Sequence, residues 1–515
     1  MALVPGGRLS CGPLNATVCA LLALSLTFVT SIACTVAAAN AGAPLASQLG
    51  PAQLGPEMTL GEPSGGYVGH LNIVPSHGPV GTAVTLTGSG MPPGQDIQLV
   101  WTTVNGSWKV ADGEYHGRTF NPAAYRIATV TSDASGAFSA TFVAPDDFGF
   151  THDILAQQGN RLLTQTAFSI DMTVTMASSS GPLGTPIELD VKGIGWRELQ
   201  ASWMLLYDNR YTGWMSSITT HGSARVVIPA VGRPGLHILE VLNSDFGSVY
   251  RNMQQSPQPD RPRFKLAFTI TPGAPVLPPP AEQQLQANVR SLSPPGELVT
   301  TPAFSSINRP VVTVGTGFDP RQTYTLNWTS LTGNRIIGHW EEASRTVAQA
   351  KPDASGRLEF RYQVPDDLGG NHTLWVDRGD AKPGEKSLGT YWVMPSALPL
   401  DVTRGPVGTT FKVHLKGVGW TETANIYTLV YDNGHTGYAC AFNSQGDIEI
   451  FMQATGAPGW HFIDLYPAIY KGKETSPVSF RLPQLTYAHD HPGEDLPAFH
   501  FAFEVTEGGS TPVGQ

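Results

Sequence analysis

The chain has 515 residues, which at roughly 100–200 residues per domain predicts about three to five domains. Glycine (56 residues) and proline (42) are abundant and charged residues make up only 14%, a composition that favours many short strands and turns over long solvated helices. Acidic residues (41) outnumber basic ones (31) and no basic cluster occurs, so we expect no nucleic-acid partner.

The first 39 residues have the pattern of a secretory signal peptide. Arg8 precedes an apolar run over residues 16–33, and three alanines end at Ala39. The run approaches the roughly 20 residues that span a bilayer, so an uncleaved anchor stays an alternative, as does lipid attachment at Cys34. No later segment is apolar enough to cross a membrane. We therefore expect a secreted, periplasmic or cell-surface protein that meets the membrane only through an uncleaved or lipidated N-terminus.

An internal duplication is the strongest organisational signal in the chain. Residues 181–185 (GPLGT) recur as residues 405–409 (GPVGT), and residues 133–136 and 353–356 both read Asp-Ala-Ser-Gly. We interpret the chain as modules in the order A, B, A′, B′. The predicted parts are a signal peptide or N-terminal anchor over 1–39, module A over 67–172, module B over 173–272, a Pro-rich linker over 273–299, module A′ over 300–395 and module B′ over 396–507.

Apolar residues alternate with polar ones within the modules, as in Ile97, Leu99 and Trp101. A period of two predicts half-buried strands, and Asp-Ala-Ser-Gly at 133–136 between two such runs predicts a β-hairpin. About seven short strands in about 100 residues are typical of a β-sandwich. The predicted fold class is all-β, with four tandem immunoglobulin-like β-sandwich domains in an A-B-A′-B′ duplication.

The linker has the composition of an extended, semi-rigid spacer, with three prolines at residues 278–280. Such a segment offers few contacts to bridge its two sides. We therefore expect the A–B half and the A′–B′ half to fold independently.

The head of each module invites comparison with a known family. Residues 77–82 (HGPVGT) precede GSGM at 88–91, and residues 404–409 (RGPVGT) precede GVGW at 417–420. Both resemble the opening of the IPT/TIG-type immunoglobulin-like domains of bacterial secreted proteins, over the first 15 to 25 residues of A, B and B′. Module A′ departs from it, with NRP at 308–310. The resemblance implies a sandwich fold and a structural or binding role.

Module B′ contains residue types that suit a hydrolase. Cys440, the one cysteine outside the leader region, is a candidate nucleophile, with His461 as its base and Asp464 as a carboxylate. His237 of module B occupies the same place as His461, after a Pro-Gly turn. Because both modules keep this histidine, we favour a structural hydrogen bond for it and leave a secreted hydrolase as an alternative.

The densest set of potential metal ligands lies near the C-terminus, and it comprises His489, Asp490, His491 and His500. A His-x-His pair on a strand points both imidazoles the same way, which suits zinc or copper. The stretch is an insertion absent from module B and contains prolines, so a solvated acidic loop is the other interpretation.

Five aromatic residues are less tied to the core pattern than the tryptophans that recur in the repeats. They are Trp108, Tyr211, Trp214, Trp340 and Tyr438. They predict either a face that stacks on sugar rings or ordinary packing.

The sequence as a whole favours a non-enzymatic, extracytoplasmic binding or structural protein. Its modules would meet a glycan, an envelope polymer or a protein partner. We expect no cofactor. The alternatives are the secreted hydrolase and a periplasmic metal-binding protein that uses the last loop.

Overall fold

All residues described here fall in one compact unit, Pro44–Gln515. The computed structural model describes residues 54–508 apart from 63–64, 198, 244–248, 256–260, 285–295, 335–338, 380–381, 383 and 471–480. The predicted signal peptide lies outside these residues. No helix of the described part is long and apolar enough to cross a membrane.

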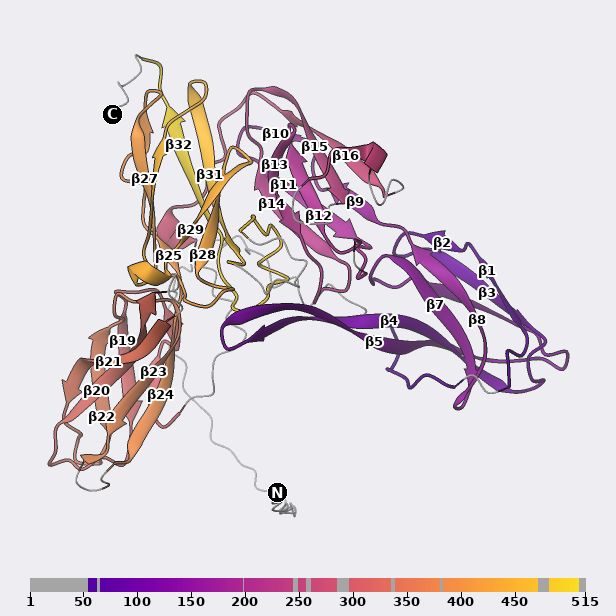
Figure 1. The fold of residues 1–515 in the computed structure, drawn as a ribbon, viewed down its shortest axis with the longest axis horizontal. Helices are drawn as coiled ribbons and strands as arrows, with labels where there is room; N and C mark the ends of the chain where they lie inside the picture. The colour runs from indigo at the N-terminus through magenta and orange to yellow at the C-terminus, as the bar shows by residue number, and fades with distance from the viewer. Residues whose placement is uncertain are drawn as a thin grey trace, which may run out of the picture. The chain divides into compact units, whose positions relative to one another are not determined.

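The predicted fold class is confirmed, because the regular structure consists of strands that form four tandem immunoglobulin-like sandwiches (Figure 1). Module A holds β1 (His70–Val74), β2 (His77–Gly78), β3 (Ala83–Ser89), β4 (Asp96–Ala111), β5 (Glu114–Thr131), β6 (Phe138–Val143), β7 (Phe150–Gln158) and β8 (Arg161–Ile170). Module B holds β9 (Thr173–Met176), β10 (Ser180–Gly181), β11 (Pro186–Lys192), β12 (Trp203–Tyr207), β13 (Arg210–Met215), β14 (Ala224–Pro229), β15 (Gly235–Asn243) and β16 (Arg263–Ile270).

The second half repeats this series of strands. Module A′ holds β17 (Val299–Thr301), β18 (Phe304–Ser305), β19 (Pro310–Gly315), β20 (Tyr324–Asn334), β21 (His339–Ala350), β22 (Leu358–Gln363), β23 (Gly370–Asp377) and β24 (Lys386–Val393). Module B′ holds β25 (Ser396–Ala397), β26 (Arg404–Gly405), β27 (Thr410–Lys416), β28 (Ile426–Tyr431), β29 (Gly434–Cys440), β30 (Ile448–Gln453), β31 (Gly459–Ala468) and β32 (Phe499–Val505). Short 3-10 turns are η2 (Met253–Gln255), η3 (Ala281–Gln283) and η5 (Phe442–Ser444).

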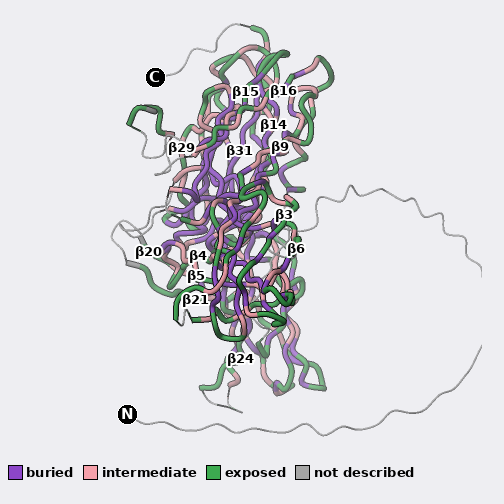
Figure 2. The backbone as a smooth tube through the Cα atoms, turned by 90° about the vertical axis from the view of Figure 1, so that its right-hand side faces the viewer, coloured by how far each residue is buried: buried purple, intermediate pink, exposed green. Residues whose placement is uncertain are grey.

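Every module pairs a three-stranded sheet with a five-stranded one. In module A the orders are β1-β3-β6 and β2-β8-β7-β4-β5, and the other three modules repeat them. In module A the two-residue strand β2 runs parallel to the last strand, β8. The pairs β7–β8 and β4–β5 are antiparallel. Strand β3 alternates exposed and buried residues, so one face of each sheet enters the core between the layers (Figure 2).

The Asp-Ala-Ser-Gly turn does not form the predicted hairpin. Strand β5 belongs to the five-stranded sheet and β6 to the three-stranded one, so the turn at residues 133–136 crosses between the sheets. Its local chemistry is as expected: the Asp133 carboxylate accepts N–H bonds from Ser135 at 2.8 Å and from Ala137 at 2.9 Å, and Gly136 has φ of 75°.

Module A meets module B as A′ meets B′. The Gly149 N–H donates to the carbonyl of Ile194 at 3.0 Å. The Gly369 N–H likewise donates to the carbonyl of Val418 at 3.0 Å. A Cβ on Gly149 would lie 1.7 Å from the oxygen of Gly193, and one on Gly369 would lie 2.0 Å from the equivalent oxygen. Both junctions therefore need glycine for the backbones to approach.

Strands β4 and β5 form a long two-stranded arm that reaches module B′ (Figure 1). The Tyr115 N–H donates to the Glu422 carboxylate at 2.9 Å, and the Glu422 N–H donates to the Gly113 carbonyl at 2.7 Å. The Trp108 indole N–H donates to Asp490 at 2.9 Å. The arm of module A therefore links the first half of the chain to module B′ in the second half.

Modules B and B′ also share buried surface. Val430, Phe462 and Tyr466 of B′ belong to the same buried cluster as the core of B. The Thr212 hydroxyl donates to the carbonyl of Asn433 at 2.8 Å across the junction. The expectation that few contacts bridge the two halves is therefore wrong, because the bridging contacts come from side chains far from the linker.

Candidate functional site

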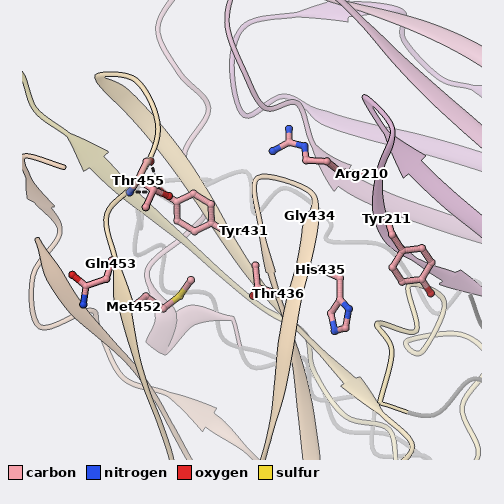
Figure 3. A pocket seen from close by; sticks show the side chains of 9 residues that line it. All are labelled: Arg210, Tyr211, Tyr431, Gly434, His435, Thr436, Met452, Gln453 and Thr455. Carbon is pink, nitrogen blue, oxygen red and sulfur yellow. Dashed lines mark hydrogen bonds between the residues drawn. The ribbon is translucent and has the colours of Figure 1, made fainter. Parts of the chain in front are cut away.

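An open cavity of about 480 Å³ lies between the start of strand β13 of module B and strands β28, β29 and β30 of module B′ (Figure 3). We call it the B–B′ groove. Its lining residues are Arg210, Tyr211, Tyr431, Gly434, His435, Thr436, Met452, Gln453 and Thr455.

Equivalent hairpins of the two B modules form the walls of the B–B′ groove. The turns Asp208-Asn209 and Asp432-Asn433 both have positive φ, at 48° and 64° and at 46° and 57°. This conformation suits Asn and Asp in two-residue hairpins. Tyr211 and His435, which the duplication aligns, meet edge to face at 6.1 Å. The groove is thus a product of the duplication, since neither module forms it alone.

The polar groups of the groove are mostly committed to the protein. The Tyr431 hydroxyl donates to the carbonyl of Thr455 at 2.9 Å, and the Tyr211 hydroxyl donates to the sulfur of Met204 at 3.3 Å. Burial raises the pKa of both tyrosines, so both stay neutral. The Arg210 side chain is exposed and makes no ion pair within the described residues. The groove therefore offers ring faces and one available cation.

His461, at the edge of this region, is held on both ring nitrogens. Its Nδ1 lies 2.6 Å from the Asp432 carboxylate and its Nε2 lies 2.8 Å from the Ala457 carbonyl, while its ring stacks on Tyr431 at 5.6 Å. Two acceptors require two N–H donors, which only the imidazolium has. Burial lowers the pKa of His461, but the hydrogen bond and charge of Asp432 raise it more, and the net shift is upward.

Module B repeats this arrangement. Nδ1 of His237 lies 2.6 Å from Asp208, its Nε2 lies 2.8 Å from the carbonyl of Arg233, and its ring stacks on Tyr207. The predicted shared hydrogen bond of His237 and His461 is present in both modules, and its structural role stays a prediction.

The residues of the alternative hydrolase site do not converge. His461 and Asp464 lie three positions apart on β31, so their side chains leave opposite faces of the strand. Cys440 pairs with Ile426, which pairs with Ala468, seven residues along β31 from His461. That separation corresponds to about 23 Å along a strand. The nucleophile is thus out of reach of its proposed base.

Asp490, one of the predicted metal ligands, is fully buried and bound by protein donors. Its carboxylate accepts N–H bonds from Ile218 at 2.7 Å and Thr219 at 2.9 Å, besides the indole of Trp108. The alternative expectation that this stretch is a solvated loop is therefore wrong. The segment instead joins the arm, module B and module B′.

The other predicted ligands have separate partners. Nδ1 of His500 lies 2.7 Å from Asp464, and the ring of His491 stacks on Tyr487 at 5.6 Å. His489 is half-buried, and its N–H donates to the carbonyl of Thr486. Across the described part of the chain, no group of three or more His, Cys, Asp or Glu residues could hold a metal ion. The metal site stays a prediction.

The five candidate aromatic residues divide between packing and exposure. Trp214 is 2% exposed and Trp108 is bound to Asp490, so both serve packing. Trp340 and Tyr438 are exposed. Tyr211 alone of the five lines the B–B′ groove.

Sequence reasoning missed Arg210, Met452 and Gln453 as groove residues. None of them belongs to a motif. The one signal that could have found them is the alignment of Tyr211 with His435, if the two repeats had been expected to pack against each other.

Comparison with known proteins identifies no family. No protein-family model and no curated protein matches the chain. Among solved structures, the chain is similar to Escherichia coli alpha-2-macroglobulin, at 11% identity, with 83% of this chain and 30% of that one covered and a TM-score of 0.17.

Two other bacterial structures give similar values. PorU from Porphyromonas gingivalis is 10% identical over 64% of this chain and 34% of its own, with a TM-score of 0.16. Adhesin InvE from Yersinia pseudotuberculosis is 14% identical over 48% of this chain and 67% of its own, with a TM-score of 0.18. The chain spans about a third of the first two proteins, and scores this low carry no inference about function.

Proposed function

We propose that the chain is an exported, non-enzymatic binding protein whose B–B′ groove holds a segment of an acidic glycan. The observation that carries the proposal is the groove itself. It combines the rings of Tyr211 and Tyr431 with the available guanidinium of Arg210 in a cavity of ligand size. Tyrosine rings pack against the apolar faces of sugars, and arginine binds carboxylates with two parallel N–H bonds.

The wider setting of the proposal comes from the sequence. The leader over residues 1–39 supports export, with a mature chain from Asn40 at the surface or in the periplasm. The Gly-Pro-x-Gly-Thr turns support kinship with IPT/TIG-type modules. We keep the module limits 67–172, 173–272, 300–395 and 396–507 as part of the proposal.

Calorimetric titration of the chain with an oligouronate and with a neutral glucan oligosaccharide of equal length tests the proposal. We expect the oligouronate to bind and Arg210→Ala to weaken it at least about tenfold, or about 1.4 kcal/mol. Lys351→Ala, which removes an exposed cation in module A′, is the matched control and should bind as the unmodified chain does. Equal affinity of the Arg210→Ala variant would contradict the groove as the site.

A further inference from the structure

The outer faces of two equivalent strands, β31 and β15, differ in burial. Every residue of β31 from His461 to Ala468 is buried, so the strand is covered on both faces. Strand β15 begins with exposed and buried residues in alternation, and its outward Leu236 and Ile238 are 65% and 42% exposed. These two residues are the counterparts of Trp460 and Phe462 in the duplication. The same apolar face is therefore covered in B′ and open in B.

The cover over Phe462 on β31 includes the head turn of module B, residues 181–185. A Cβ on Gly184 would lie 2.7 Å from the Phe462 ring, so the turn sits directly on that ring. Leu183, the preceding residue, is half-buried and packs against the cluster that contains Phe462. The contact is thus made by a head turn of one B module on the sheet face of the other.

Module B′ has the same turn, and it is open. The Gly184 N–H donates to Ala230 at 2.8 Å, and the Gly408 N–H donates to Ala454 at 2.9 Å, so the two turns have the same hydrogen bonding. Val407, the counterpart of Leu183, is 40% exposed. Among the described residues of modules B and B′, the head turn of B therefore packs on the face of B′, while the head turn of B′ and the face of B stay exposed.

We propose that the unused head turn at Val407 docks on the unused face at Leu236 and Ile238 of a second copy of this chain. The contact is head-to-tail, in that it joins two different surfaces. A second copy of this chain is the partner because, at the B–B′ junction, a turn of the same sequence pattern already packs on the equivalent face. Apolar burial supplies the attraction, because both surfaces expose large aliphatic side chains.

Disulfide trapping in the full chain tests the contact, in a background where Cys11, Cys19, Cys34 and Cys440 are serine. One preparation carries Ile238→Cys and the other carries Val407→Cys. We expect the mixture to form disulfide-linked dimers on mild oxidation. We expect neither preparation to do so alone, because a head-to-tail contact brings unlike positions together. Dimers from either single variant alone, or none from the mixture, would overturn the proposal.

Sedimentation of the unmodified chain provides the second measurement. Ile238→Asp and Val407→Asp should each weaken self-association at least about tenfold, since each places a charge in an apolar contact. Phe451→Asp is the matched control, because Phe451 is 67% exposed on β30, which belongs to the other sheet. Equal weakening by the control, or a monomer at every concentration, would also overturn the proposal. Melting curves confirm that each variant is folded.

Discussion

At the scale of single residues, the duplication preserves whole hydrogen-bonded groups. In module A the Trp101 indole donates to Asp147 at 2.8 Å, and His152 stacks on its ring at 4.5 Å. Module A′ repeats this with Trp328 and Asp367 at 2.9 Å. The sequence alone shows that the tryptophans recur in the repeats, but it does not show why. The reason is that a buried indole N–H and a buried imidazole both need acceptors.

Replacement of His461 by alanine tests the structural role of the paired histidines. The change removes bonds to Asp432 and Ala457 and leaves the carboxylate without its partner. We expect a loss of about 1–3 kcal/mol in the free energy of unfolding. His237→Ala should cost a similar amount, because its bonds have the same lengths. Chemical denaturation measures both; unchanged stability in the two variants would argue for a role in binding or catalysis.

The raised pKa of His461 also predicts a pH dependence. A histidine whose pKa is higher in the folded than in the unfolded state stabilises the fold while it is protonated. That contribution is complete below the unfolded value, about 6.5, and is lost as pH rises through the folded value. We therefore expect stability to fall above about pH 6.5, and the fall to be smaller in His461→Gln. An identical pH profile for the variant would contradict this account.

At the scale of the elements, strands were predictable and their partners were not. The period of two at Ile97, Leu99 and Trp101 predicts strand β4, because burial of one face is a local property of the sequence. The crossing after β5 was mistaken for a hairpin, because the choice of sheet depends on distant strands. Module A′ lacks the Gly-Pro-x-Gly-Thr sequence but has the same kind of head turn. Asn308 stands at the glycine position with φ of 58°, and its N–H donates to the carbonyl of Val364. Asparagine is one of the few residues other than glycine that adopt that conformation with some frequency.

Gly369→Ala tests the junction between A′ and B′. The added Cβ would lie 2.0 Å from the facing carbonyl oxygen, so the backbones must separate and the bond to Val418 must lengthen or break. We expect a lower melting temperature and faster exchange of the residue 369 amide, which donates to the Val418 carbonyl. Gly149→Ala should do the same at the A–B junction. As a control, Ser355→Ala changes an exposed turn far from either junction. A variant that melts like the control would show that the junction adjusts freely.

At the scale of the whole molecule, the contacts that join the modules were not predictable from the sequence. Trp108 and Asp490 are 382 positions apart, and no sequence motif links the two residues. The arm looks like an ordinary pair of strands, and the insertion looks like a polar loop. The positions of the arm and the insertion depend on the surfaces that they contact, and these surfaces exist only after the modules have folded. The groove between B and B′ was missed for the same reason.

Asp490→Ala tests whether the insertion joins the modules or serves a metal. The change leaves the N–H groups of Ile218 and Thr219 and the indole of Trp108 without this acceptor. The Ile218 N–H is buried and the other two donors are partly buried. At about 1–3 kcal/mol for a buried donor left unpaired, we expect a loss of stability of at least that size. Glu342→Ala, on an exposed position of β21, is the control and should leave the melting temperature unchanged. A structural Asp490 also predicts that a chelator has no effect on the unmodified chain. If zinc raises the melting temperature of the unmodified chain and not of Asp490→Ala, the metal site is supported and the purely structural role of Asp490 is wrong.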